Sequence, residues 1–254
     1  MHAVQPVVLA FDVFGTVVDW HGSIVDEVNE LGLQVNASEF ARSWRAGYKP
    51  AMAKVMSGEL GWTRIDDLHR MTLDESLAEF DLALDQSKAD ALNLVWHRLK
   101  AWPDVVQGLN RLRENYMICT LSNGNLSLLA DMAKAAGLPW DLILSAEVFK
   151  AYKPHPDTYL GVANVFDVKP EQVMLVAAHH DDLLAARDCG LQTAYIERPA
   201  EFGQDAVKDV SEQAFTDYHA SDFLHLADLL CGLATPTVAA VSYTHLTLPT
   251  ILLV

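Results

Sequence analysis

A single carboxylate ends an apolar segment of strand length near the start of the chain. Residues 7–11 read Val-Val-Leu-Ala-Phe, Asp12 follows them directly, and a Gly-Thr turn ends at Thr16. An Asp at the carboxyl end of a buried parallel strand lies where open α/β sheets bind their ligands. Turn amides that hydrogen-bond such a carboxylate keep it ionised, so Asp12 could act as a nucleophile. Taken alone, this Asp would more often be part of an Asx-turn after a buried strand than a nucleophile.

Two further segments carry polar side chains that could meet this carboxylate. Ser122 and Asn123 follow a second apolar segment, and their side chains and free backbone N–H groups could hold a carboxylate or a phosphate. Lys153 is followed by Pro154 and, after His155, by a second proline, and these rings stiffen the backbone behind the lysine. A lysine fixed in this way could keep the first carboxylate ionised. Alone, the two segments would be a polar turn and a solvated lysine.

A fourth polar segment follows the strongest apolar run, residues 173–178. It contains two histidines and then two aspartates, His179 to Asp182. Such a cluster suggests a metal site, but neighbouring side chains at a strand end point in different directions. The metal interpretation is therefore disfavoured, and no metal or other cofactor is expected.

The elements that must position these residues alternate between strand-length and helix-length segments, which is typical of an α/β fold with a parallel sheet. About a hundred residues separate the first two strands, far more than one crossover helix needs. This interval predicts a helical insertion over the strand ends, with Ser38 and Ser87 as N-caps. The expected strands are 7–11, 117–121, 142–144, 173–178 and 193–196, and the inserted helices are 23–31, 38–56, 65–84 and 87–101.

The composition excludes several classes of partner. The chain of 254 residues has 34 acidic and 18 basic side chains and a net charge of −16, which argues against nucleic acid and against an anionic membrane surface. An anionic substrate would need a local basic site. The three cysteines are far apart and odd in number, and the N-terminal residues lack a basic leader, so a reducing, cytoplasmic location is expected.

The expected domains are a catalytic core formed by residues 1–18 and 101–235, and a helical cap formed by residues 19–100. Charged residues end at Asp228, and residues 242–250 resemble translated sequencing-adapter read-through. Residues 236–254 are therefore expected to be a non-native or disordered tail, and they are excluded from the functional argument.

The order of the polar segments resembles the haloacid dehalogenase superfamily over residues 5–232. That resemblance implies a Rossmann-like parallel sheet, an inserted helical cap and a nucleophilic Asp12. Phosphatases of the superfamily usually carry a second Asp two positions after the nucleophile, and a later acidic pair that holds Mg²⁺. Phe14 and Ala178 occupy two of these positions here. A halide leaving group needs neither a proton donor nor Mg²⁺, so the phosphatase becomes the alternative.

The closer resemblance is to the type II L-2-haloacid dehalogenases. Arg45 looks like that family's cap arginine, and Lys153 and Tyr159 keep its lysine-to-tyrosine spacing. The resemblance implies that Arg45 contacts the departing halide and the substrate carboxylate. Its alternative is a surface arginine on an amphipathic helix. The residues expected around the substrate are Phe14, Thr16, Ser122, Asn123 and Tyr159.

The implied reaction converts a short 2-haloalkanoic acid, an L-2-haloacid or haloacetate, to a 2-hydroxy acid and halide. Asp12 would attack the halogen-bearing carbon and form an ester, which water would then cleave with help from Asp182. His179 is either the base for this second step or a hydrogen-bonded supporting residue. Many type II sequences have Trp where this chain has Asp181, so pocket size and substrate preference stay open.

Three alternatives remain open at the level of sequence. The protein could be a Mg²⁺-dependent phosphatase of small molecules, or a non-catalytic domain that binds an anion or a protein partner. A homodimer is possible, because relatives of this family are commonly dimers. Trp96 and Leu99 could lie at such an interface or in the core of the cap itself.

Overall fold

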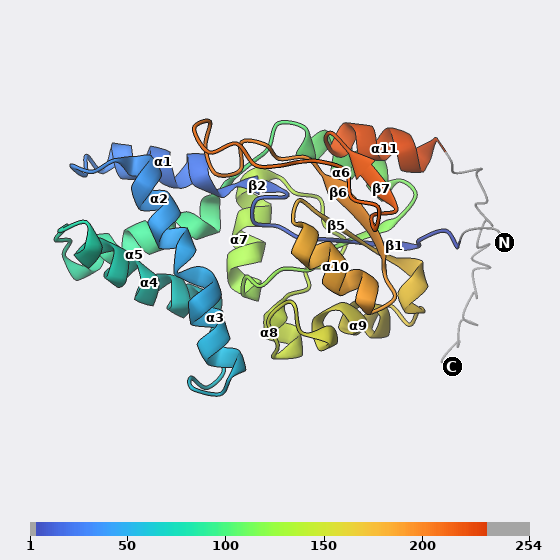
Figure 1. Ribbon diagram of the computed structural model, residues 1–254, viewed down its shortest axis with the longest axis horizontal. Helices are drawn as coiled ribbons and strands as arrows, with labels where there is room; N and C mark the ends of the chain where they lie inside the picture. Colours follow the sequence, from blue (N-terminus) through green and yellow to red (C-terminus); the bar gives the residue numbers. More distant parts are fainter. Residues whose placement is uncertain (1–3, 233–254) are drawn as a thin grey trace, which may run out of the picture.

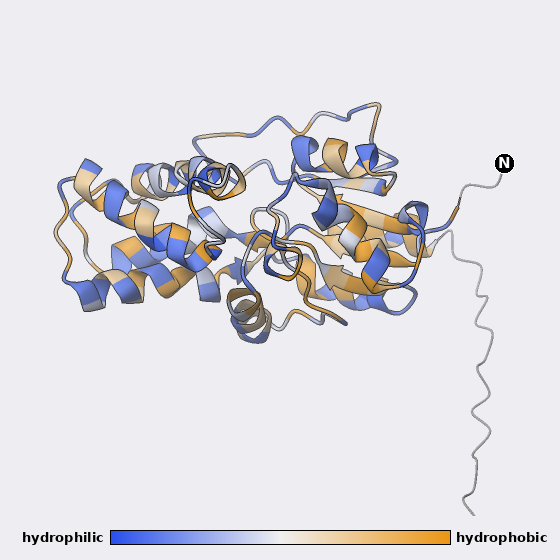
Figure 2. Cartoon of the chain, turned by 90° about the horizontal axis from the view of Figure 1, so that it is seen from below, coloured by the Kyte–Doolittle hydropathy of each residue, from blue (hydrophilic) through white to orange (hydrophobic). Residues whose placement is uncertain are grey.

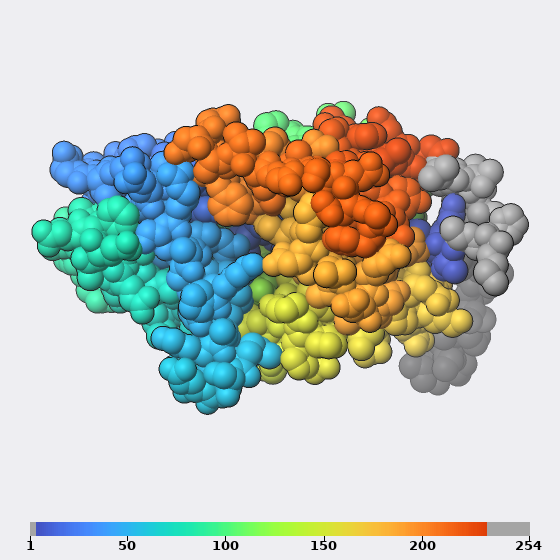
Figure 3. Space-filling model, in the orientation of Figure 1, coloured from blue at the N-terminus to red at the C-terminus, as the bar shows by residue number. Residues whose placement is uncertain are grey.

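The computed structural model describes residues 4–232, so the predicted tail, 236–254, lies outside the described residues. A parallel sheet with flanking helices occupies one end of the molecule, and a group of helices occupies the other (Figure 1). The space-filling view shows the two parts meeting along the middle of the molecule (Figure 3).

The sheet has five strands in the order β4-β1-β5-β6-β7, and every neighbouring pair is parallel. The α/β fold expected from the sequence is therefore confirmed. The expected strand at 142–144 is wrong, since Leu142 forms only an isolated bridge with Cys119. The short, half-buried last strand gave no apolar signal and was missed. The strands are β1 (Val8–Phe11), β4 (Met117–Thr120), β5 (Val173–Ala177), β6 (Gln192–Ile196) and β7 (Tyr218–Ala220).

Both faces of the sheet are covered by helices, which explains why its central strands are continuously apolar. Alternate residues of β1 enter different hydrophobic clusters: Leu9 and Phe11 pack with residues of α6 and α11, whereas Val8 and Ala10 pack with residues of α9 and α10. Figure 2 shows these strands as a hydrophobic layer between amphipathic helices. The helices of this part are α6 (Val105–Arg113), α7 (Leu126–Ala136), α8 (Ala146–Phe149), α9 (Pro156–Val165), α10 (His180–Asp188) and α11 (Phe223–Cys231).

The inserted helices are joined to the sheet through a pair of very short antiparallel strands, β2 (Val18–Asp19) and β3 (Lys100–Ala101). The chain thus enters and leaves the helical part at adjacent positions. This pairing supports our proposal that residues 19–100 form a cap region and that 1–18 with 101–235 form the core. The cap helices are α1 (Trp20–Glu30), α2 (Ala37–Ala46), α3 (Tyr48–Met56), α4 (Ile65–Glu79) and α5 (Gln86–Asn93), and a 3₁₀ helix, η1, spans Leu94–Arg98.

Two helix predictions in the cap are corrected. The single helix expected at 38–56 is broken at Gly47, where a Cβ would lie 2.7 Å from Cγ2 of Thr72 on α4. Close approach of α4 therefore requires glycine at the break. The helix expected at 87–101 ends at Asn93 and continues as η1 and β3.

The N-caps differ from the prediction as well. The carbonyl oxygen of the Asn36 side chain caps α2, and the Asp85 carboxylate caps α5, in place of Ser38 and Ser87. Each capping residue lies two positions before the predicted serine, and either side chain can accept a hydrogen bond from a free N–H of the first turn. No helix within the described part of the chain is both long and apolar enough to cross a membrane.

The cap has an aromatic core of its own. Trp96 and Leu99 are buried within the chain, and the Trp96 ring packs 5.4 Å from that of Trp44. Of the two alternatives for these residues, the structure supports the cap core. The same aromatic cluster reaches Phe14 at the sheet edge, whose ring lies 5.7 Å from Trp96.

Candidate active site

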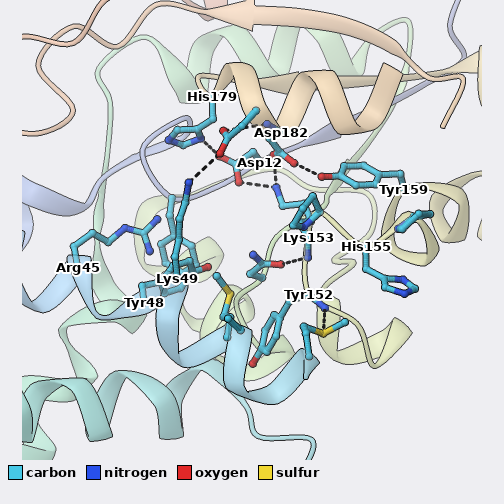
Figure 4. Close-up of a pocket in the computed structure, with 18 residues that line it drawn as sticks. Asp12, Arg45, Tyr48, Lys49, Tyr152, Lys153, His155, Tyr159, His179 and Asp182 are labelled. Carbon is cyan, nitrogen blue, oxygen red and sulfur yellow. Dashed lines mark hydrogen bonds and ion pairs between the residues drawn. The ribbon is translucent and has the colours of Figure 1, made fainter. Parts of the chain in front are cut away.

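A cavity of about 720 Å³ lies between the cap and the carboxyl ends of the strands. The core contributes Asp12, Lys153 and His179 to its wall, and the cap contributes Arg45 and Tyr48. Figure 4 shows these side chains pointing into a common space from the two sides. Residues that are far apart in the sequence are therefore brought together where the sequence analysis predicted a site.

The sheet order explains how the core residues meet. Strand β1 lies between β4 and β5, so the residues that follow these three strands share one edge. Asp12 follows β1, Asn123 lies just beyond β4, and His179 lies just beyond β5. Crossovers that leave a central strand in opposite directions open a crevice at its carboxyl end, and this is the usual ligand site of such sheets.

A buried lysine joins two carboxylates at this edge. Nζ of Lys153 lies 2.9 Å from Oδ1 of Asp12 and 2.5 Å from Oδ2 of Asp182. The Tyr159 hydroxyl donates to the other oxygen of Asp182 at 2.6 Å. The backbone N–H of Lys153 donates to the Asn123 side chain at 2.8 Å, which fixes the lysine from behind. All three charged side chains are nearly inaccessible to solvent, so their mutual contacts replace hydration.

The second oxygen of Asp12 also has two partners. Thr16 donates from its hydroxyl at 2.7 Å, and Nδ1 of His179 lies 3.1 Å away. Burial opposes ionisation of Asp12, but the charges of Lys153 and His179 outweigh it and hold the pKa of this carboxyl well below its usual range. Burial, together with the charge of Asp12, instead raises the pKa of Asp182. Asp12 is therefore the carboxylate that stays ionised most firmly.

His179 connects Asp12 to a buried glutamate that the sequence analysis missed. Its Nε2 lies 2.8 Å from Oε1 of Glu201, and the other oxygen of Glu201 pairs with Nζ of Lys208 at 2.5 Å. Burial lowers the pKa of His179, but the charge of Glu201 and the contacts with Asp12 outweigh it and raise that pKa to about 9. Burial opposes ionisation of Glu201 too, yet His179 and Lys208 lower its pKa to about 2.

The turn after Asp12 makes room for this glutamate. Gly15 has a φ of +87°, and a Cβ at that position would lie only 2.2 Å from Oε1 of Glu201. Glycine is required there both for the backbone conformation and for the close approach. A sequence signal for Glu201 existed, since it follows the end of a predicted strand, β6, at the same sheet edge. Nothing local distinguished it from a surface glutamate.

The cap wall contains a cation without an anionic partner. The guanidinium of Arg45 lies 3.9 Å from the ring centroid of Tyr48. It lies 5.7 Å from the ring centroid of Phe14 and 5.6 Å from that of Trp20. Its Nη1 is buried and has no hydrogen-bond partner among residues 4–232. A buried guanidinium N–H without an acceptor is unfavourable. An anion from outside the chain would supply this acceptor beside the aromatic rings that surround Arg45.

Not every predicted residue reaches the cavity. The Ser122 side chain is buried behind the wall, where its hydroxyl accepts from the backbone N–H of Gly124 at 3.2 Å and shapes the turn. Thr16 contacts Asp12 without lining the cavity. Asp181 lines the mouth and pairs with Lys49 of α3 at 2.9 Å, and both side chains are largely exposed.

The donor groups at the sheet edge do not form a metal site. Within the described residues, no three His, Cys, Asp or Glu side chains are arranged to hold a metal ion. Asp12 and Asp182 are both held by the ammonium group of Lys153, and the backbone N–H of Ala178 donates to Thr16. A hard divalent cation is held in proteins by carboxylate oxygens, and those of Asp12 and Asp182 already contact this ammonium group.

The chain resembles known hydrolases over most of its length. The family model described as haloacid dehalogenase-like hydrolase matches residues 7–190. The (S)-2-haloacid dehalogenase 4A of Burkholderia cepacia is 30% identical over 199 residues, which are 74% of this chain and 81% of that protein. The haloacetate dehalogenase H-2 of a Moraxella species is 28% identical over 195 residues, covering 75% of this chain and 85% of that protein.

A solved structure agrees with these sequence matches. The crystal structure of an L-2-haloacid dehalogenase superposes with a TM-score of 0.86 at 42% identity. The superposition covers 90% of this chain and all of that one.

Proposed function

The chain belongs to the haloacid dehalogenase-like hydrolases, and from that membership and the site geometry we propose that it hydrolyses 2-haloalkanoic acids to 2-hydroxy acids and halide. The observation that carries the proposal is a firmly ionised Asp12 that faces Arg45 across one cavity, where the buried Nη1 of Arg45 has no hydrogen-bond partner within residues 4–232. The first group supplies a nucleophile, and the second supplies a site for the anion that leaves.

In the first step, an Asp12 oxygen attacks the halogen-bearing carbon in line with the carbon–halogen bond. A carbon–oxygen bond forms, the carbon–halogen bond breaks with inversion, and its electron pair leaves with the halide. Arg45 stabilises the departing halide within its aromatic surroundings, where water does not compete strongly. Lys153, Thr16 and His179 fix the plane of the attacking carboxylate.

In the second step, water attacks the ester carbonyl of Asp12 and releases the hydroxy acid. Formation of the ester removes the negative charge of Asp12, so the pKa of His179 falls from the value of about 9 that it has beside the free carboxylate. His179 therefore loses its proton to solvent and, oriented by Glu201, takes a proton from the attacking water. The bond between the Asp12 carbonyl carbon and the alkoxide oxygen then breaks, and His179 returns that proton to the departing oxygen. The proton of the restored Asp12 carboxyl group then recharges His179. Lys153 stabilises the oxyanion that develops on the ester, and Asp182 holds Lys153 in place.

We further propose that the reaction needs no metal ion. Phe14 cannot protonate a leaving oxygen and instead packs against the cap, while Ala178 supplies no carboxylate. The observed donor set supports this proposal, because the Lys153 ammonium already occupies one oxygen of each acidic side chain. Phosphoryl transfer depends on metal charge that this site is not built to bind.

The decisive experiment measures halide release from chloroacetate and from each 2-chloropropionate enantiomer in the presence of EDTA. Asp12→Asn is the matched control, because it keeps the shape of the side chain and removes the nucleophilic charge. We expect release that favours the L enantiomer and is lost in the variant. Prompt halide release by Asp12→Asn would remove Asp12 as the nucleophile. Magnesium-dependent hydrolysis of an aryl phosphate without halide release would favour the phosphatase instead.

A further inference from the structure

The cavity has two chemically different ends. Its inner end holds the charged groups described above, Asp12, Lys153 and Arg45. In Figure 4, Tyr152 lies on the opposite side of the cavity from His179, and the His155 ring points away from the centre. The outer wall is formed mainly by apolar side chains from α3 and from residues 152–156, at the start of α9: Met52, Ala53, Met56, Tyr152, Pro154 and Pro156.

Helix α3 supplies a continuous apolar stripe to this outer wall. Tyr48, Met52 and Met56 follow one another at a spacing of four residues, so they lie on the same helix face. Met56 is 40% exposed although it is apolar, and it lines the cavity. Its sulfur accepts from the backbone N–H of Tyr152 at 3.3 Å, which joins the two sides of the outer wall.

The opposite side of the outer wall is fixed in position. The Tyr152 hydroxyl donates to the backbone carbonyl of Thr63 at 2.6 Å, and its ring stacks on Trp62 with centroids 4.9 Å apart. The Asp181 side chain does not fill the apolar end, because its carboxylate pairs with Lys49 at the mouth of the cavity. The apolar end therefore stays open next to the charged end.

The volume exceeds what a two-carbon substrate would fill. A cavity of about 720 Å³ falls in the range that accommodates drug-sized ligands, whereas a haloacetate has only a few non-hydrogen atoms. The two anionic groups, carboxylate and departing halide, belong at the inner end. Of the lysine and arginine side chains that line the cavity, Arg45 alone has no ion pair within residues 4–232. The space left over is lined by apolar side chains.

We infer that the preferred 2-haloacid carries an apolar group larger than methyl on its halogen-bearing carbon, and that this group lies along Met52, Ala53 and Met56. The inference rests on the proposed dehalogenase function and specifies its substrate class. Methionine side chains have flexible, polarisable chains that adapt to ligands of different shape, which suits a linear alkyl group. Burial of that group away from water supplies the preference for substrates with an alkyl group larger than methyl.

Chain length can be tested directly with L-2-bromopropionate, L-2-bromobutyrate, L-2-bromohexanoate and L-2-bromooctanoate. We expect kcat/KM to rise roughly fourfold for each methylene buried until the apolar end is filled. A kcat/KM that falls steadily with chain length while chloroacetate is turned over would overturn this inference and leave the proposed function intact. Absence of halide release from every substrate, chloroacetate included, would overturn both.

A substitution in the outer wall separates binding of the alkyl group from the chemistry. Ala53→Phe would fill the apolar end, so we expect the ratio of kcat/KM for bromohexanoate to that for chloroacetate to fall at least tenfold. Lys54→Phe adds the same ring to the next position of α3, which does not line the cavity, and should leave that ratio unchanged. Equal ratios in both variants and the wild type would contradict placement of the alkyl group against α3.

Discussion

The two walls of the cavity hold their charges in opposite ways. On the core wall every charge is already paired, with Lys153 between two carboxylates and His179 between Asp12 and Glu201. On the cap wall Arg45 is surrounded by aromatic rings and lacks an anionic partner within the described chain. The core wall is therefore organised before substrate arrives, whereas the electrostatics of the cap wall are completed by the substrate itself.

This difference predicts that core substitutions damage both stability and activity. Lys153→Met would remove the cation that lies between two buried carboxylates, and we expect a loss of about 3 to 5 kcal/mol in the free energy of unfolding. Halide release should also be abolished. The stability loss should narrow as the pH falls, because the two carboxyl groups can then share a proton. Urea unfolding at several pH values measures both effects.

The control for that substitution is Lys134→Met, which alters an exposed lysine on α7. It should change the free energy of unfolding by less than about 0.5 kcal/mol. If Lys153→Met were as stable as this control, the core wall would not be held together by charge pairing.

A cap substitution should instead reduce activity with little effect on stability. Arg45→Lys keeps the charge but loses the planar guanidinium that stacks on Tyr48, and we expect kcat/KM to fall by about 10²- to 10³-fold. The free energy of unfolding should change by no more than about 1 kcal/mol, because no ion pair is broken. Steady-state halide release and thermal unfolding measure the two quantities.

Arg64→Lys, at an exposed position of the same region, provides the reference for such a conservative change. A destabilisation of Arg45→Lys comparable to that of Lys153→Met would remove the distinction between the two walls.

The charge of Glu201 should act mainly on the second chemical step, in which it orients His179 as the base. Glu201→Gln keeps the shape of the side chain but removes the charge that orients His179, so we expect ester hydrolysis to slow by about 10- to 100-fold. The covalent ester on Asp12 should then accumulate and be detected by mass spectrometry as the added acyl mass. Halide release in a single-turnover experiment should stay near its original rate.

Glu197→Gln is a closely matched control, because Glu197 forms the same kind of contact with His219, at 2.7 Å, away from the cavity. The ester should not accumulate in this variant. Equal accumulation in both variants would indicate a general effect of losing a carboxylate that contacts a histidine.

The smallest effect concerns the pH dependence of stability. The pKa of His179 is raised from 6.5 to about 9 by its two carboxylate neighbours, so the folded protein binds a proton that the unfolded chain has lost. The stabilisation of the folded protein by this bound proton is fully present below pH 6.5 and is lost as the pH rises through 9. Relative to His179→Gln, the wild type should lose on the order of 2 kcal/mol between pH 6.5 and 9.5. Parallel pH profiles of the two proteins would show that His179 is not charged in the resting site.

The core wall was largely predictable because its residues carry local signals. Asp12, Asn123 and His179 each follow an apolar strand, and parallel strands end at a common edge. Lys153 was indicated by the prolines around it and by the family resemblance, and the structure places its ammonium on Asp12. Glu201 escaped because it is distinguished only by burial beside Gly15, which two distant segments create together.

The sequence by itself determined four strands of the sheet, the position of the carboxylate at the end of β1 and the existence of a helical insertion, because periodicity and strand-end position are local properties. Only the tertiary structure decided what the cap contributes. The break at Gly47 depends on Thr72, and the surroundings of Arg45 combine rings from the core and the cap. Such contacts join residues with no fixed spacing along the chain, so packing alone decides which side chains meet at the cavity.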